Sequence, residues 1–232
     1  MTFSRSDLER AAASTGFQAE ALEKVFRLLG LLQSLRSHPF LKHRLVLKGG
    51  TALNLFLFDV PRLSVDLDLN YIGAADRETM LSEKPGIEQA VSAVCGRLNI
   101  RVMRVPDEHA GGKWRLSYDS TTGRTGTLEL DLNYVLRTPL WPCKVSDSRS
   151  LGTFNATQVP VLDVHELAAG KLAALFGRNA SRDLFDVCSL LREQTLDGLR
   201  LRLGFVVYGG ANRRDWRTIT IEDIRADSRE VE

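Results

Sequence analysis

The chain has 232 residues, 44% apolar and 26% charged, a composition typical of a globular protein with one large domain or two small ones. The formal charge of +2, from 31 basic and 29 acidic residues, argues against a dominating basic field and leaves local patches as the basis for any nucleic-acid binding. Cys95, Cys143 and Cys188 have neither disulfide-framework nor zinc-site spacing, and no apolar stretch is long enough to span a membrane. We therefore expect a soluble, cytoplasmic protein that does not bind a membrane.

The first 40 residues are predicted to form two helices. Ser6 and Glu9 have the spacing of a capping box, and Gly16 is a typical helix stop. A second helix is expected over Ala19–Ser37, because Pro39 prevents its continuation. Apolar residues recur there at helical spacing and predict a buried stripe formed by Leu22, Val25, Phe26, Leu29, Leu32 and Leu35.

A short strand, two glycines and a helix are predicted next. Leu45–Lys48 reads as a buried strand, Gly49 and Gly50 as the turn, and Thr51–Phe58 as the helix. Glycines at such a turn let the backbone approach a phosphate closely, and the helix N-terminus offers N–H groups to anionic oxygens. The structural alternative is a tight strand-to-helix connection.

Apolar and acidic residues alternate one by one between Ser64 and Tyr71. This period of two predicts a half-buried strand with Asp66 and Asp68 on one face, their Cα atoms roughly 6–7 Å apart. Two carboxylates at this spacing repel each other unless a cation lies between them. The pattern therefore predicts a metal site, with an exposed strand face as the alternative.

The middle of the chain is predicted to contain one helix and three strands. These are a helix over Asp76–Leu98 interrupted at Pro85-Gly86, a strand over Ile100–Val105, and a hairpin of Trp114–Tyr118 and Thr127–Val135 around the turn Gly123–Gly126. The last strand also alternates, so Glu129, Asp131 and Asn133 share a face. Asp131 is thus a candidate third carboxylate on the side of the sheet that carries Asp66 and Asp68.

The C-terminal part is predicted to be helical. The expected helices are Asp163–Phe176, Ser181–Arg192 and Leu199–Tyr208, after a loop-rich connector bracketed by Pro139, Pro142 and Pro160. The charged stretch Asp215–Glu232 is expected to be a peripheral strand or a tail. The predicted fold class is α+β, with a sheet-containing domain over 1–150 and a mainly helical domain over 151–232.

A second group of charges lies in the predicted helical part. Lys171 lies among apolar residues, and a surface lysine with a buried stem is its structural alternative. Asp183 and Asp186 share a helix face, where capping or a salt bridge to Arg182 or Lys171 is the alternative to a role in a site.

Three motifs occur in a fixed order along the chain. They are Lys48-Gly49-Gly50-Thr51-Ala52-Leu53, Arg62-x-Ser64-x-Asp66-x-Asp68, and Lys171 followed by Arg182-Asp183-x-x-Asp186. Together, over about Lys48 to Leu191, they resemble the motif set of the AbiEii family. Its members are nucleotidyltransferase toxins of type IV-like toxin–antitoxin and phage-defence systems, including the mycobacterial MenT toxins. The resemblance implies a polymerase-β-like nucleotidyltransferase core with a mixed sheet, followed by a helical domain that completes the active site.

The resemblance also implies roles for single residues. Asp66, Asp68 and Asp131 would coordinate Mg²⁺, with Mn²⁺ as the alternative ion, and Asp131 would help to deprotonate the acceptor hydroxyl. The implied catalytic set is Asp66, Asp68, Asp131, Lys171 and Asp186. The implied nucleotide-binding set is Lys48, Gly49, Gly50, Thr51, Ser64, Lys171 and Asp183.

By resemblance, the expected activity is transfer of a nucleoside monophosphate from an NTP to an RNA acceptor, the 3′ end of tRNA, with Mg²⁺ and release of pyrophosphate. Such a toxin would inhibit translation or abort phage infection, and a cognate antitoxin would restrain it. Three alternatives stay open: nucleotidyl or phosphoryl transfer to a protein hydroxyl, glycosyl transfer from a metal-bound nucleotide sugar, and a non-catalytic member that only binds a partner.

Overall fold

The computed structural model of the chain describes residues 3–106, 108–211, 215–220, 222 and 224. The chain divides into a sheet unit, Met1–Pro139 with Cys143–Val161, and a helical unit, Leu140–Pro142 with Leu162–Glu232. The boundary expected after residue 150 falls inside the sheet unit, because the chain up to Val161 still adds strands to the sheet.

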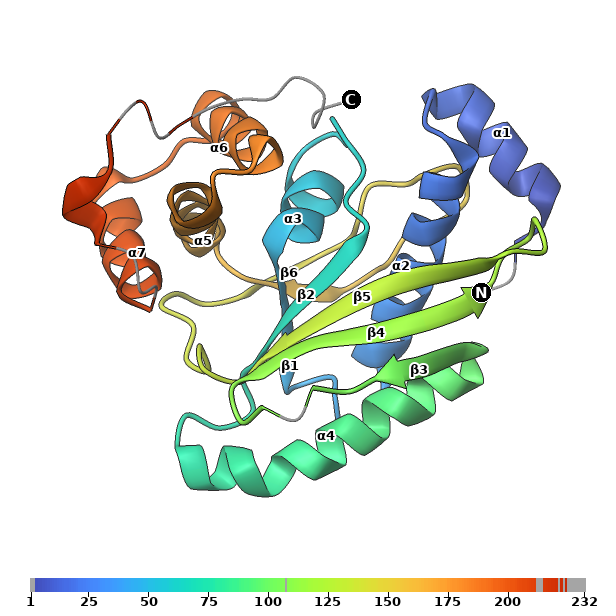
Figure 1. Cartoon of the computed structure of the whole chain (residues 1–232), viewed down its shortest axis with the longest axis horizontal. Coiled ribbons are helices and arrows are strands. Elements are labelled where there is room, and N and C mark those ends of the chain that lie inside the picture. Colours follow the sequence, from blue (N-terminus) through green and yellow to red (C-terminus); the bar gives the residue numbers. More distant parts are fainter. Residues whose placement is uncertain (1–2, 107, 212–214, 221, 223, 225–232) are drawn as a thin grey trace. The chain divides into compact units, whose positions relative to one another are not determined.

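The sheet unit contains one mixed seven-stranded sheet (Figure 1). Its strands are β1 (Leu45–Lys48), β2 (Asp66–Tyr71), β3 (Ile100–Arg104), β4 (Gly111–Asp119), β5 (Thr125–Asn133), β6 (Lys144–Ser146) and β7 (Val159–Val161). Its described α-helices are α1 (Arg5–Thr15), α2 (Ala19–Ser37), α3 (Gly49–Ala52) and α4 (Arg77–Arg97). The strand order is β3-β4-β5-β2-β1-β7-β6, in which β2 is parallel to β5, β1 is parallel to β7, and the other neighbours are antiparallel.

One face of this sheet forms the core of the unit. Leu67 and Leu130 are Cα partners on β2 and β5 and are almost completely buried, as the alternation of these strands predicts. Helix α4 belongs to this side, since the Tyr71 hydroxyl donates to Glu83 of α4 (2.7 Å), and α2 contacts α4, β2 and β5. Burying each such leucine stabilises the fold by roughly 1.5–3 kcal/mol. The opposite face therefore carries the polar residues of the same strands.

The connector predicted to be loop-rich contains two short strands. Strand β7 pairs in parallel with β1, with Leu47 opposite Val161, and β6 pairs with β7. The sequence prediction missed β7 because it is only three residues long and has Pro160 at its centre, which usually marks a loop.

Two local predictions in this unit were wrong. The capping box of α1 is formed by Ser4 and Asp7 instead of Ser6 and Glu9, because the extended Ser4 lets its hydroxyl accept from the Asp7 N–H (3.2 Å) while Asp7 accepts from the Ser4 N–H (2.8 Å). Helix α4 runs through Pro85 without the expected interruption. Proline removes one N–H donor, and the buried apolar residues of α4 outweigh that loss.

The helix after the glycine turn also differs from the prediction. It begins at Gly49 and not at Thr51, and after Ala52 it continues as a π-helix over Leu53–Leu57. The side chains of this segment are almost all buried. The glycines are therefore the first turn of the helix, and not a linker before it.

The helical unit contains α5 (Val164–Arg178), α6 (Ser181–Glu193), α7 (Gly198–Gly210) and a 3₁₀ turn over Trp216–Thr218. Helix α5 packs against both α6 and α7. Of the predicted peripheral stretch Asp215–Glu232, residues 221, 223 and 225–232 lie outside the described residues.

Buried Glu166 joins the segment Leu140–Pro142 to this unit. Its carboxylate accepts from the backbone N–H groups of Leu140 (3.0 Å) and Trp141 (3.3 Å) and from the Tyr208 hydroxyl (2.9 Å). Burial raises the pKa of Glu166 above its usual range in spite of these donors. No local pattern indicated this role, because the partners lie 25 to 42 positions away.

Candidate functional site

Four carboxylates share the polar face of the sheet. Because β2 and β5 run in parallel and in register, Asp68 lies opposite Asp131 and Asp66 lies opposite Glu129. Neighbouring strands are about 4.8 Å apart, and alternate residues on a strand lie roughly 6–7 Å apart. We call these four residues the acid block. The predicted meeting of Asp131 with Asp66 and Asp68 is thus found in the structure, with Glu129 as a fourth member.

All four residues of the acid block are partly exposed. Their strand neighbours Leu67, Leu69, Leu130 and Leu132 are buried on the other face. The four side chains of the acid block therefore reach solvent, where carboxylates keep their charge at low cost and remain accessible to a ligand.

Gly49 lies directly against the acid block. Its φ of +73° belongs to the left-handed region, and a Cβ atom there would lie 2.0 Å from Asp68 Oδ2 and 2.7 Å from its Cγ. No side chain fits this space, so only glycine lets the turn backbone touch the Asp68 carboxylate. Lys48, the preceding residue, is the Cα partner of Asp68 on β1.

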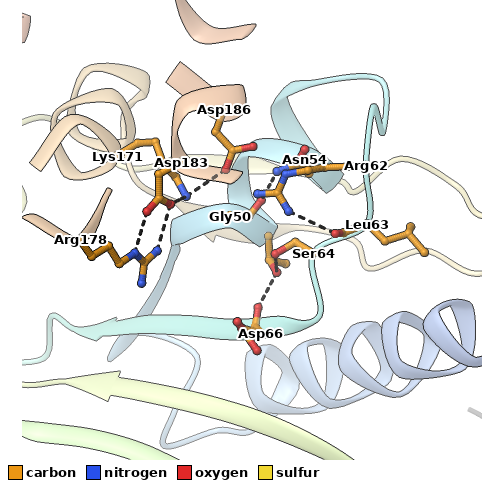
Figure 2. Close-up of polar contacts among 11 residues, drawn as sticks. Gly50, Asn54, Arg62, Leu63, Ser64, Asp66, Lys171, Arg178, Asp183 and Asp186 are labelled. Carbon is orange, nitrogen blue, oxygen red and sulfur yellow. Dashed lines mark hydrogen bonds and ion pairs between the residues drawn. The ribbon is translucent and has the colours of Figure 1, made fainter. Parts of the chain in front are cut away.

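The second glycine and its neighbours form a buried support. A Cβ atom on Gly50 would lie 2.9 Å from Ser64 Oγ. The Thr51 hydroxyl donates to the backbone carbonyl of Asp66 (2.5 Å) and lies 3.1 Å from the Ser64 hydroxyl. Asn54 donates from its side-chain amide to the Gly50 carbonyl (3.0 Å), and Figure 2 shows Gly50, Asn54, Ser64 and Asp66 of this group. Thr51 and Ser64, both predicted to bind nucleotide, are buried and connect the turn to β2.

The acid block suits a metal that is shared with a substrate. Among the residues that the structure describes, no three His, Cys, Asp or Glu side chains form a ready-made metal site. Mg²⁺ does not need one, because it usually binds one or two protein carboxylates and fills its octahedral shell with water and substrate phosphates. Asp66 and Asp68 on one strand, with Asp131 beside Asp68, supply hard oxygen donors of this kind.

Lys113 is a neighbour of the acid block that the sequence analysis missed. It is the Cα partner of Asp131 on β4, and its ammonium lies 2.7 Å from Glu129 Oε2. The hydrogen bond to Glu129, assisted by the charges of Glu129, Asp66 and Asp131, raises the pKa of Lys113. The predicted strand began at Trp114, because Gly111 and Gly112 resemble a turn, and this left Lys113 unplaced.

The predicted charge cluster of the helical unit is a buried ion-pair network. Lys171 of α5 lies 3.0 Å from Asp183 Oδ1 and 2.9 Å from Asp186 Oδ2 of α6, and Arg178 lies 2.6 Å from Asp183 Oδ2 (Figure 2). Both aspartates are completely buried, and Lys171 is 7% exposed. The alternative of a surface lysine is therefore wrong, and the salt-bridge alternative holds with Arg178 in place of Arg182.

The network sets the protonation of Asp183. Burial alone would raise the pKa of this carboxyl, but the hydrogen bonds and charges of Arg178 and Lys171 hold it below its usual value. Asp183 therefore stays ionised inside the helical unit, and it is neutralised by two cations.

No helix among the described residues is both long and apolar enough to cross a bilayer. A mixed sheet with paired carboxylates beside a glycine turn, followed by helices, is the architecture of a nucleotidyltransferase. The profile described as "Nucleotidyl transferase AbiEii toxin, Type IV TA system" matches residues 30–231, and the chain belongs to this family. It is thus a nucleotidyltransferase toxin of a toxin–antitoxin system, which confirms the family and the enzyme class predicted from the motifs.

Solved structures support the fold. The nucleotidyltransferase toxin MenT4 from Mycobacterium tuberculosis H37Rv superposes with a TM-score of 0.69 at 23% identity, over 99% of this chain and 80% of that one. The antibiotic-resistance factor ANT(2″)-Ia gives a TM-score of 0.50 at 14% identity, over 82% of this chain and 94% of that one. No curated protein sequence matches the chain. The predicted α+β fold with a nucleotidyltransferase core and C-terminal helices is confirmed.

Proposed function

We propose that this toxin transfers a nucleoside monophosphate from an NTP to an RNA acceptor, the 3′ end of tRNA, and depends on Mg²⁺ or Mn²⁺. The observation that carries the proposal is the register of β2 and β5, which sets Asp68 beside Asp131, with the Gly49 backbone in contact with Asp68. Carboxylates next to a glycine turn that begins a helix are what a metal-bound triphosphate requires.

The residues of the sheet unit would have different roles in the reaction. Asp66 and Asp68 would hold the metal, whose charge stabilises the triphosphate during transfer. Asp131 would accept the proton of the attacking hydroxyl, because it lies next to Asp68. The Gly49 and Gly50 backbone would face the triphosphate, and Lys48 would add positive charge at this edge. Thr51 and Ser64 would keep the turn in place through their buried hydroxyls.

The reaction is an in-line displacement at the α-phosphorus. The acceptor 3′ oxygen forms a bond to this phosphorus while the bond to the oxygen bridging the α- and β-phosphates breaks, and pyrophosphate leaves. The proton of the acceptor hydroxyl passes to Asp131. Most of the acceleration then comes from positioning and charge stabilisation.

Three residues of the helical unit keep their proposed roles. Lys171 would contact the nucleotide phosphates, and Asp186 and Asp183 would orient its ammonium. The support is the network itself, in which Lys171 is buried and held by both carboxylates at 2.9–3.0 Å. A lysine fixed in this way has little conformational entropy left to lose on binding an anion.

Transfer to tRNA would inhibit translation, or abort phage infection, and a cognate antitoxin would restrain the toxin. The support is the membership of the chain in a toxin–antitoxin family. Transfer of a nucleotidyl or phosphoryl group to a protein hydroxyl is the second candidate, because the same carboxylates would activate a serine or tyrosine hydroxyl.

One labelling experiment separates these activities. Purified protein is incubated with Mg²⁺, total tRNA and a protein lysate, and with each NTP labelled at the α- or the γ-phosphate. We expect α-label, and no γ-label, in the RNA fraction, and neither in a variant carrying Asp66→Ala and Asp68→Ala. Label in protein bands, or equal labelling by the wild type and the double variant, would contradict RNA nucleotidyl transfer by the acid block.

A further inference from the structure

Basic residues lie next to the acid block on the neighbouring strands of the sheet. The row of Asp68 and Asp131 reaches Lys113 on β4. The row of Asp66 and Glu129 reaches Arg115 on β4 and then Arg104 on β3, which a β-bulge after Val102 brings opposite Arg115. We call Lys113, Arg115 and Arg104 the basic margin of the acid block.

Two members of the basic margin lack a counter-ion. Arg104 and Arg115 are both exposed, and neither forms an ion pair within the described part of the chain. Like charges directly opposite each other on neighbouring strands destabilise a sheet. Farther along the same strands Arg101 is neutralised by Asp119 (2.7 Å). The fold therefore gains nothing from the pair of arginines, which suggests an anionic ligand.

The direction of the reaction indicates the identity of the anionic ligand. This step rests on the proposed function. In-line attack requires the acceptor to approach the α-phosphorus from the side opposite to the leaving pyrophosphate. The glycine turn follows β1, so the triphosphate would lie toward β1. The acceptor must then come from the β5 and β4 side, across Lys113 and Arg115.

We propose that the basic margin binds the phosphate backbone of the acceptor RNA near its 3′ end. Arg115 and Arg104 would each contact a phosphate through their planar guanidinium groups, which match phosphate oxygens well. Lys113 pairs with Glu129 and forms the border between the acid block and these arginines. Backbone contacts of this kind position a strand without reading its sequence.

The test compares two double variants in binding RNA without any nucleotide. Arg104→Gln with Arg115→Gln removes the basic margin's unpaired charges, and Arg77→Gln with Arg97→Gln removes the same charge from exposed positions of α4. The probe is a fluorescent single-stranded RNA with a free 3′ hydroxyl, titrated at several salt concentrations. We expect about tenfold weaker binding only for the first variant, and a salt slope smaller by about 1.4, the value for two contacts on a single strand.

Three further readouts decide the proposal. Thermal unfolding of the Arg104 and Arg115 variant should occur at the wild-type temperature or above, because a repulsive pair has been removed. Its Mg²⁺-dependent NTP binding should be unchanged by calorimetry, while its KM for RNA rises and its kcat stays the same. Equal RNA affinity and salt slope in both double variants would overturn the proposal, as would wild-type binding of acidic peptide in preference to RNA. Failure of the wild type to transfer label to RNA would instead count against the proposed function, because binding is measured without turnover.

Discussion

Replacing Gly49 with alanine is expected to abolish nucleotidyl transfer. The new Cβ atom would lie 2.0 Å from Asp68 Oδ2, a distance at which either the turn or the carboxylate must move. A displacement of about 1 Å at a reacting centre costs on the order of 100-fold in rate. The left-handed backbone at φ +73° adds about 1–2 kcal/mol of strain for any residue other than glycine.

Gly16→Ala is the matched control for this substitution. Gly16 also has a left-handed backbone, at φ +76°, but apart from its own chain neighbours no described residue has an atom within 4 Å of the position that an alanine methyl would take there. Both variants should lose similar stability from backbone strain, and only Gly49→Ala should lose activity and Mg²⁺-dependent NTP binding. Activity in Gly49→Ala equal to that of Gly16→Ala would show that contact between the turn and Asp68 is not required.

Replacing Lys171 with methionine is expected to give the largest loss of stability. It would leave Asp183 and Asp186 buried with one cation fewer, and breaking a buried ion pair typically costs about 3–5 kcal/mol. Urea unfolding monitored by circular dichroism measures the effect. Adding Asp183→Asn and Asp186→Asn to Lys171→Met should restore part of the loss, because the two buried negative charges that lost their lysine are then removed.

The exposed pair of Lys113 and Glu129 provides a comparison. Its atoms lie 2.7 Å apart, but the two side chains are 58% and 37% exposed. Solvent screening limits such a pair to about 1 kcal/mol or less, so Lys113→Met should change the unfolding free energy little. Equal destabilisation by Lys171→Met and Lys113→Met would contradict the view that burial makes the α5–α6 network important.

The local part of the site was predictable from the sequence. Alternation alone placed Asp66 and Asp68 on one face and Asp131 on the matching face of its own strand. Whether the two strands were neighbours was not predictable, because strand pairing depends on contacts between distant segments. The structure supplies this missing fact, the parallel register of β2 and β5.

Features that depend on tertiary packing were not predictable. The burial of Lys171 follows from the packing of α5 against α6, and its local pattern is that of a surface lysine. The sequence pattern placed Glu129 on the acidic face. It did not assign its partner Lys113 to a strand, because the two glycines before Lys113 resemble a turn. Similarly, β7 forms because it pairs with β1. A pattern of only three residues does not indicate such pairing.

The role of the acid block is tested most directly by comparing its carboxylates with one another. Single-turnover transfer of α-labelled NTP to tRNA is measured for Asp68→Asn, Asp131→Asn and Glu129→Gln, which each remove one charge from the same face of the sheet. We predict losses of at least about 100-fold for the two aspartates, as expected for a metal ligand and a general base, and less than about tenfold for Glu129, which pairs with Lys113. Near-wild-type rates in Asp68→Asn and Asp131→Asn would contradict the assignment of the acid block as the nucleotidyl-transfer centre.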